Sequence, residues 1–106
     1  MLYDIIFVVW LHFIADFLLQ SNWMSMNKSK DSAVLLLHCC AYSLPLLWFG
    51  LPFALLNGSI HFFVDFITLR ITSKLYAKKE IHWFFVVIGL DQAIHITTLI
   101  LTLFLL

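Results

Sequence analysis

Charged side chains are scarce in this chain. Only 11% of its 106 residues are Asp, Glu, Lys or Arg, whereas 63% are hydrophobic. Six basic and six acidic side chains are too few to give a domain of this size a polar surface. The composition therefore argues against a water-soluble domain and predicts an integral membrane protein, with lipid around most of its exterior. The formal net charge is zero, so the total charge by itself says nothing about acidic or nucleic-acid partners. For a chain surrounded by lipid we expect no nucleic-acid partner.

Glycine, proline and cysteine are also rare. The three glycines and two prolines fall mainly near predicted turns, so the broken helices that surround the central sites of many transporters are not expected. Cys39 and Cys40 are adjacent in an apolar segment, where neighbouring side chains point in different directions and do not easily form a disulfide. The chain has no Gly-x-Ser-x-Gly motif, which argues against covalent serine catalysis.

Four apolar segments approach the ~20 residues needed to cross a ~30 Å hydrocarbon layer. We therefore predict an all-α fold, a four-helix membrane bundle that forms one transmembrane domain over residues 1–106. The predicted spans cover residues 2–20, 33–49, 52–76 and 83–106. Asp31 or Ser32 is predicted to cap the second helix, and Pro45 to kink or end it. Pro52 suits the first turn of the third helix.

The basic side chains gather in two short windows of the sequence. The first window holds Lys28 and Lys30, and the second holds Arg70, Lys74, Lys78 and Lys79. With four spans, both windows lie on the same side of the membrane, and the positive-inside rule makes this side cytoplasmic. We therefore predict a multi-pass membrane protein with loops 21–32 and 77–82 in the cytoplasm and both termini outside.

A histidine and an aspartate lie four residues apart in three of the four segments. The pairs are His12/Asp16, His61/Asp65 and Asp91/His95. This spacing places both side chains of a pair on one face of a helix, one turn apart. With a rise of ~1.5 Å per residue, these side chains and His38 lie at similar depths below the basic loops. We therefore expect the polar faces to meet inside the bundle, in its cytoplasmic half.

The first and third segments also share a short internal repeat. It reads "HFIADF" from residue 12 and "HFFVDF" from residue 61, on the first helix of each predicted pair of spans. A duplication of helical hairpins would produce this pattern, with the two halves related by an axis along the membrane normal.

Carboxylates inside a membrane span must be neutralised, by protonation, by a histidinium partner or by a bound metal cation. An aspartate near the centre of a span costs about 2.5–3.5 kcal/mol. Imidazoles and carboxylates are ligands that zinc, manganese and iron accept, so we predict one or two divalent ions. The predicted metal ligands are His12, Asp16, His61 and Asp65; His38, Asp91 and His95 complete the site or act as base and acid; and Gln20, Asn57 and Gln92 support the ligands through hydrogen bonds.

Several longer stretches resemble a known family. They are "HFIADFLLQSNWMSMNKSK", "LLLH", "NGSIHFFVDFITLRITSKLY" and "HWFFVVIGLDQAIH". Together they resemble a family of small bacterial and phage membrane proteins that is defined only as a domain of unknown function. The pattern HxxxDxxxQ, H, HxxxD and DQxxH covers most of the chain. The resemblance implies four spans and, with the charge distribution, a place in the bacterial inner membrane, but it implies no reaction. A more remote likeness is to membrane-bound metal-dependent hydrolases of the YdjM type.

Three functions are compatible with these residues. The first is a membrane-embedded metal-dependent hydrolase that acts on a lipid-like phosphoester or ester at the cytoplasmic leaflet. Membrane lipid is then the partner, and Lys28 and Lys30 are placed to hold a phosphate or an anionic headgroup. The second is a metal-ion or proton transporter or channel that uses the same His/Asp ladder. The third is a non-catalytic membrane protein with a structural polar network. The sequence leaves open whether protomers associate as a homo-oligomer.

Overall fold

The computed structural model describes residues 1–106, which form helices joined by short connections and no strands. In chain order the elements are α1 (Leu2–Phe13), the π-helical turn η1 (Ile14–Leu18), α2 (Asn22–Asn27), α3 (Ser32–Leu46), the 3₁₀ turn η2 (Leu47–Phe49), α4 (Leu51–Ala77) and α5 (Ile81–Leu105). The all-α prediction is confirmed.

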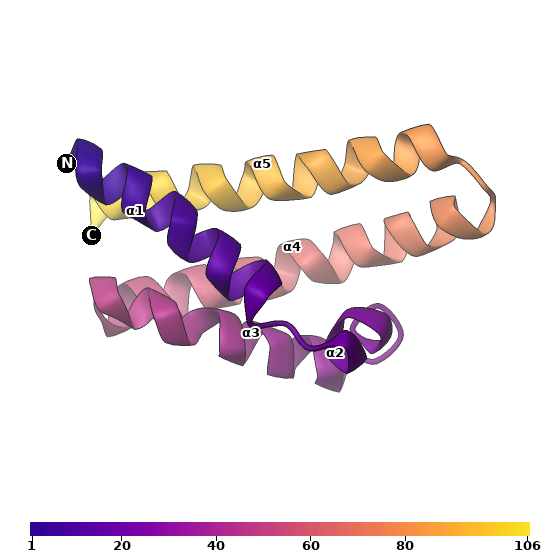
Figure 1. Ribbon diagram of the computed structural model, residues 1–106, viewed down its shortest axis with the longest axis horizontal. Coiled ribbons are helices and arrows are strands. Elements are labelled where there is room, and N and C mark those ends of the chain that lie inside the picture. The colour runs from indigo at the N-terminus through magenta and orange to yellow at the C-terminus, as the bar shows by residue number, and fades with distance from the viewer.

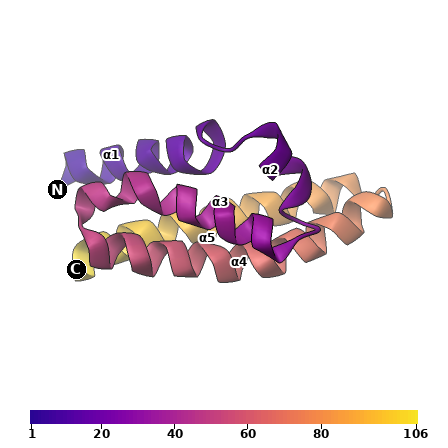
Figure 2. The ribbon, with the colours of Figure 1, turned by 90° about the horizontal axis from the view of Figure 1, so that it is seen from below.

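The long helices run antiparallel to their neighbours. Helices α4 and α5 form a long hairpin, and α3 lies antiparallel to α4 (Figure 1). Helix α1 lies on one side of these three helices and runs obliquely from the end of α5 towards α3 (Figures 1 and 2). Both termini therefore lie at one end of the bundle, and α2 and the α4–α5 turn lie towards the other end.

Local sequence explains where α3 and α4 begin and where α3 ends. The Asp31 carboxylate accepts a hydrogen bond of 2.9 Å from the Ala33 N–H and caps α3, as predicted. Pro45 is in the last turn of α3, which ends one residue later and tightens into η2. Gly50 has a φ of 104°, which glycine adopts without strain, and the chain reverses there. Pro52 follows in the first turn of α4.

The connection predicted as loop 21–32 contains a short helix, α2. Ser21 caps this helix, because its Oγ accepts a hydrogen bond of 3.2 Å from the Met24 N–H. The predicted connection between two spans thus contains a helix that the sequence pattern did not indicate, and α2 is too short to span a membrane itself.

The first apolar segment changes its geometry before its predicted end at residue 20. After α1 the chain continues as η1, where the Leu19 N–H donates to the Ile14 carbonyl, five residues earlier, at 2.9 Å. Such π-helical turns are rare in proteins, and many of those that occur lie at functional sites. Here the turn carries Asp16, and the helical segment ends at Leu18.

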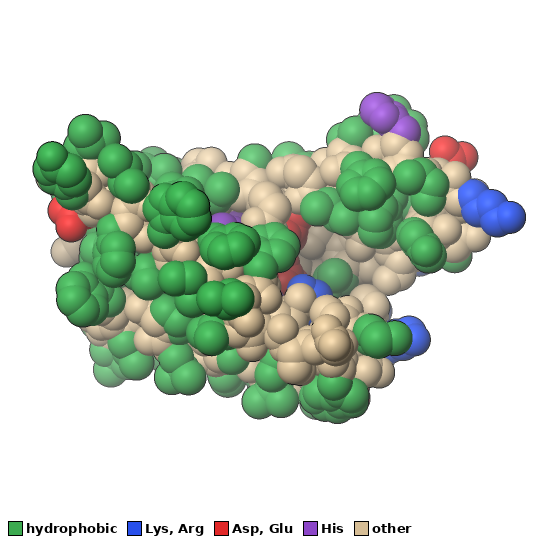
Figure 3. Space-filling model, viewed as in Figure 1, with side chains coloured by type: hydrophobic (Ala, Val, Ile, Leu, Met, Phe, Trp, Pro, Cys, Tyr) green, Lys and Arg blue, Asp and Glu red, His purple; other side chains and the backbone are tan.

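Many polar side chains are buried inside the bundle, and many large apolar side chains are exposed on its surface. Eleven of the 23 buried residues are polar or charged, whereas large side chains such as Trp10, Phe63 and Leu105 are exposed. Apolar side chains cover most of the face in Figure 3, and the Lys and Arg side chains visible there lie towards the end with the α4–α5 turn. A water-soluble helical bundle has the reverse distribution.

Three helical segments are long and apolar enough to cross a membrane. They are Ser32–Phe49, Leu51–Ala77 and Ile81–Leu105. The remaining predicted span corresponds to α1 and η1, which contain 12 and five residues and are not among the three.

A compact apolar cluster fills the bundle near the termini. We call it the apolar plug; its buried residues are Val8, Leu11, Ala15, Tyr42, Leu46, Phe53, Ala54 and Leu99. These residues come from α1, η1, α3, the start of α4 and the second half of α5. The plug therefore closes the end of the bundle at which the chain begins and ends.

Candidate metal centre

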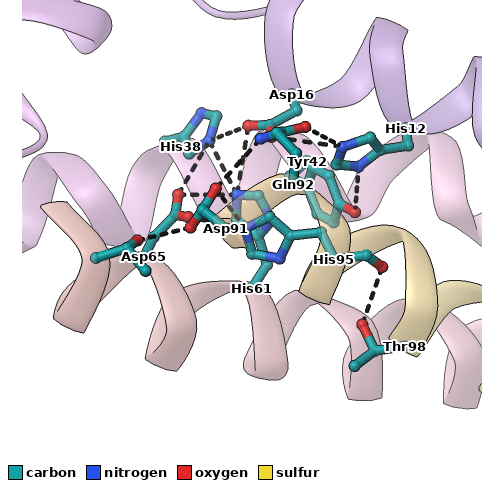
Figure 4. Close-up of polar contacts among 11 residues, drawn as sticks. His12, Asp16, His38, Tyr42, His61, Asp65, Asp91, Gln92, His95 and Thr98 are labelled. Carbon is teal, nitrogen blue, oxygen red and sulfur yellow. Dashed lines mark hydrogen bonds and ion pairs between the residues drawn. The ribbon is translucent and has the colours of Figure 1, made fainter. Parts of the chain in front are cut away.

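Six ionisable side chains from four elements meet next to the apolar plug (Figure 4). They are Asp16 from η1, His38 from α3, His61 and Asp65 from α4, and Asp91 and His95 from α5. Each of the six residues is at most 9% exposed. The polar faces of the helices thus lie inside the bundle, as their four-residue spacing suggested.

The first group of ligand atoms comes from Asp16, His38, His61 and Asp65, and we call it group A. His38 Nε2 lies 3.0 Å from Asp16 Oδ1 and 3.2 Å from His61 Nε2. His61 Nε2 lies 3.4 Å from Asp16 Oδ1 and 3.0 Å from Asp65 Oδ2. Ligand atoms around a tetrahedral zinc ion with bonds of about 2.0–2.1 Å are about 3.3 Å apart. Group A therefore has the spacing of a metal-binding site.

Ring stacking orients the His61 imidazole. Its ring lies between those of Tyr42 and His95, with centroid distances of 3.9 Å and 4.0 Å and interplanar angles of 20° and 24°. The Nδ1 atoms of His38 and His61 are buried without a hydrogen-bond partner. Both rings therefore make their polar contacts through Nε2 alone, and both Nε2 atoms point into group A.

The second group of ligand atoms comes from Asp65, Asp91 and His95, and we call it group B. His95 Nε2 lies 2.9 Å from Asp65 Oδ1 and 3.2 Å from Asp91 Oδ2. The other oxygen of Asp91 accepts a hydrogen bond of 2.6 Å from the Thr68 hydroxyl. In each group the ligand atoms lie within 4.8 Å of one another, and Asp65 belongs to both groups.

His12 lies beside the two groups and is in neither of them. Its Nε2 is 2.7 Å from Gln92 Oε1, and its Nδ1 is 3.0 Å from the Tyr42 hydroxyl. An amide oxygen can only accept, so Nε2 donates to Gln92 and Nδ1 accepts from Tyr42. Both ring nitrogens are thus engaged, and His12 Nε2 is 3.8 Å from Asp16 Oδ2. This arrangement suits a positioning residue, while the prediction of a metal ligand stays a prediction.

The three side chains predicted to support the ligands lie in different surroundings. The Gln92 amide nitrogen donates to Asp16 Oδ2 at 3.1 Å and to Asp91 Oδ2 at 3.2 Å. Gln20 makes no side-chain hydrogen bond, and its Oε1 is buried. Asn57 donates to Thr102 Oγ1 at 2.9 Å and to a backbone carbonyl, and contacts neither group.

Tyr42 is the side chain at this centre that the sequence analysis did not identify. It is 1% exposed, donates to His12 and stacks on His61. A signal was present, because Tyr42 follows His38 by four residues and so shares its helix face.

A cavity of about 660 Å³ opens onto the carboxylates. Its polar lining includes Asp16, Asp65, Asp91, Gln92 and Lys28, and its apolar lining includes Phe17, Met26, Leu69, Phe84 and Ile88. Figure 3 shows acidic and basic atoms in the hollow between the α4–α5 arm and the α2 region. The centre is therefore accessible from the end of the bundle that carries the basic side chains.

Comparison with known proteins places the chain in a family without a known activity. A family model described as a protein of unknown function (DUF3307) matches residues 5–106. No curated protein and no solved structure matches the chain. The prediction of an uncharacterised family is thus confirmed, and the likeness to YdjM-type hydrolases stays a prediction. The chain belongs to the DUF3307 family of proteins of unknown function.

Proposed function

We propose that this protein is an integral membrane, metal-dependent hydrolase of a lipid-like phosphoester or ester at the cytoplasmic leaflet of the bacterial inner membrane. The observation that carries the proposal is a buried His/Asp centre at the inner end of a cavity that also contains a cationic side chain, Lys28.

The distribution of side chains supports membrane insertion. Large apolar side chains are exposed, and the polar groups are concentrated inside. Four spans result if α1 and η1 together form the first, beside the three segments that are long and apolar enough. Both connections that carry basic residues then lie on the cytoplasmic side.

The donor set supports a divalent cation. Three buried carboxylates would each cost about 2.5–3.5 kcal/mol in a span if they lacked a positive partner. No lysine or arginine forms an ion pair with them, and their only ion-pair partners within 4.0 Å are histidines. Imidazole and carboxylate together fit zinc, manganese or iron.

The one-sided access favours an enzyme over a transporter. The cavity reaches the carboxylates from the end with the basic side chains. On the other side of the centre, the apolar plug fills the bundle with side chains such as Val8, Leu46 and Phe53, each at most 2% exposed. A path for ions across the bundle would need this plug to open.

The cavity lining favours an amphiphilic, anionic substrate. Lys28 is placed to contact a negative headgroup, and Lys30 and Arg70 line a second, smaller cavity that shares Lys28. Phe17, Leu69 and Ile88 offer apolar surface to a hydrocarbon chain. A phosphoester with a lipid tail has both properties, so this substrate class is favoured over a neutral ester.

The reaction is a hydrolysis in which one water molecule is consumed. A divalent ion held by the His/Asp centre would supply Lewis acidity, which would make a water molecule more acidic and would polarise the phosphoester. The water oxygen forms a bond to phosphorus, and the bond from phosphorus to the leaving oxygen breaks. The proton lost by the water passes to a carboxylate of the centre and then to the leaving oxygen, which departs as an alcohol.

Metal analysis and hydrolysis of a defined lipid test this proposal. Detergent-purified protein is expected to contain divalent metal and to release phosphate from short-chain phosphatidic acid. A chelator should abolish the release, and added metal should restore it. Asp65→Asn should lose both metal and activity, whereas Asp4→Asn, a change at an exposed carboxylate near the N-terminus, should lose neither.

Two outcomes would contradict the proposal. A metal-free protein that becomes only less stable on His61→Ala substitution would indicate a structural polar network. Metal or proton flux across liposomes that Asp65→Asn abolishes, without any hydrolysis, would indicate a transporter.

A further inference from the structure

We propose that the centre binds two divalent ions, one in group A and one in group B, and that the Asp65 carboxylate bridges them. This inference rests on the proposed function only in taking the His/Asp centre to be a metal site. It adds the number of ions, their ligands and their separate roles.

Asp65 presents one oxygen to each group. Its Oδ2 lies 3.0 Å from His61 Nε2 in group A, and its Oδ1 lies 2.9 Å from His95 Nε2 in group B. Paired metal ions in hydrolytic enzymes are about 3.5–4 Å apart, a distance that a bridging carboxylate can span. The stacked rings of His61 and His95, 4.0 Å apart, hold their two Nε2 atoms beside the same carboxylate.

One ion leaves part of the ligand set unused. A tetrahedral ion takes four ligands, and group A supplies four without help from Asp91 or His95. Those two residues are also buried, with exposed fractions of 9% for Asp91 and 1% for His95, and His95 Nε2 contacts both Asp65 and Asp91. A second ion uses them together with the remaining oxygen of Asp65.

The charge of the centre also favours two ions. Its three carboxylates carry three negative charges, and Lys28 is the one Lys or Arg side chain that lines the cavity. One divalent ion would leave the centre one charge negative inside an apolar bundle. Two divalent ions leave it one charge positive, which favours an anionic substrate such as a phosphoester.

The two groups differ in how many ligands the protein provides. Group A offers four, which completes a tetrahedral site, whereas group B offers three and leaves a position open. Structural zinc sites are closed, and catalytic sites keep an open position. The carboxylates of both groups line the cavity, so the number of ligands distinguishes the two ions, and only group B keeps a position for substrate or water. We therefore assign a structural ion to group A and the catalytic ion to group B.

Metal titration of single-site variants tests this assignment. Metal-depleted protein in detergent is titrated with Zn²⁺ and with Mn²⁺ alone, and bound metal per chain is measured. The wild type is expected to bind two ions. His95→Ala should bind one ion and lose the second by at least about 100-fold in affinity. His82→Ala, a change at an exposed histidine away from the centre, should still bind two.

Magnetic coupling gives a readout independent of activity. Two Mn²⁺ ions that share a carboxylate give an exchange-coupled paramagnetic resonance spectrum, and His95→Ala should give the spectrum of an isolated ion. Asp91→Asn, which keeps the size of the side chain, repeats the test if His95→Ala does not fold. Retained thermal stability identifies variants that have lost only a ligand.

The outcomes separate this inference from the proposed function. One uncoupled ion in the wild type, with phosphate release intact, overturns the two-ion centre and leaves the hydrolase proposal standing. Two coupled ions without hydrolysis of any lipid tested support the two-ion centre and overturn the hydrolase proposal. A chain that binds neither metal overturns both.

Discussion

At the scale of single residues, Gln92 joins the two groups of the centre. Its amide nitrogen donates to Asp16 in group A and to Asp91 in group B, and its amide oxygen accepts from His12. Because His12 is in turn held by Tyr42, the orientation of the Gln92 amide is determined on both sides. One side chain thus sets the separation of two carboxylates that arise from η1 and α5.

We expect Gln92→Ala to weaken divalent-metal binding by about 10–100-fold, because two ligand carboxylates lose the same donor. A zinc titration in detergent measures the change. Gln20→Ala is the matched control, since Gln20 lines the same cavity but makes no side-chain hydrogen bond. Equal losses in the two variants would mean that the Gln92 amide has no special role.

Tyr42→Phe should lower the free energy of unfolding by about 1 kcal/mol, because it removes the hydroxyl that donates to His12 and leaves the ring stacked on His61. Thermal unfolding in detergent measures this loss. Tyr3→Phe removes a hydroxyl from a side chain that is 85% exposed and should have no effect. An unchanged midpoint for Tyr42→Phe would show that His12 does not need this donor.

At the scale of helices, much of the centre was predictable from spacing. His61/Asp65 on α4 and Asp91/His95 on α5 occur in opposite order along the chain. Since α4 and α5 are antiparallel, this reversed order brings histidine beside histidine and aspartate beside aspartate. The periodicity of each helix and the hairpin connection are enough to derive that arrangement.

Other features depend on packing between helices, which spacing within one helix does not report. His12 and Asp16 share a face, yet the oblique course of α1 turns His12 towards Gln92 and Tyr42. The π-helical turn η1 leaves no mark in a periodicity of 3.6 residues. Helix α2 has six residues, too few to form a stable helix alone, so it depends on its cap and its neighbours.

The close approach of α3 and α4 depends on Gly58. A Cβ at this position would clash with Ser43 Oγ and lie 3.3 Å from Ser43 Cβ. Gly58→Ala should therefore cost about 1–3 kcal/mol, because the Ser43 hydroxyl must leave its hydrogen bond to the Cys39 carbonyl and α3 must shift by a few tenths of an ångström. The same shift would separate His38 from His61, so weaker metal binding should accompany the loss of stability.

Gly89→Ala is the matched substitution in α5. A Cβ at Gly89 would meet no atom within 4 Å, and alanine is favoured over glycine in a helix by about 0.5–1 kcal/mol. The midpoint temperature of thermal unfolding should thus rise for Gly89→Ala and fall for Gly58→Ala. A rise for both would contradict the tight contact between α3 and α4.

At the scale of the whole molecule, the closed end and the open end of the bundle fit the proposed orientation in the membrane. The plug closes the end with the termini, and the cavity opens at the end with Lys28 and the α4–α5 turn. A lipid headgroup at the cytoplasmic surface would therefore reach the carboxylates without leaving its leaflet. The orientation of the bundle in the membrane is thus part of the proposed mechanism.

Cysteine labelling of intact cells tests this orientation. In a background without Cys39 and Cys40, Tyr3→Cys should react with a membrane-impermeant maleimide from outside, because the N-terminal end is predicted to face outward. Lys78→Cys, just beyond the end of α4, should react only after the membrane is opened. Both positions are exposed, so a difference between them reports sidedness rather than burial. The reverse pattern would place the cavity outside the cell and exclude a substrate in the cytoplasmic leaflet.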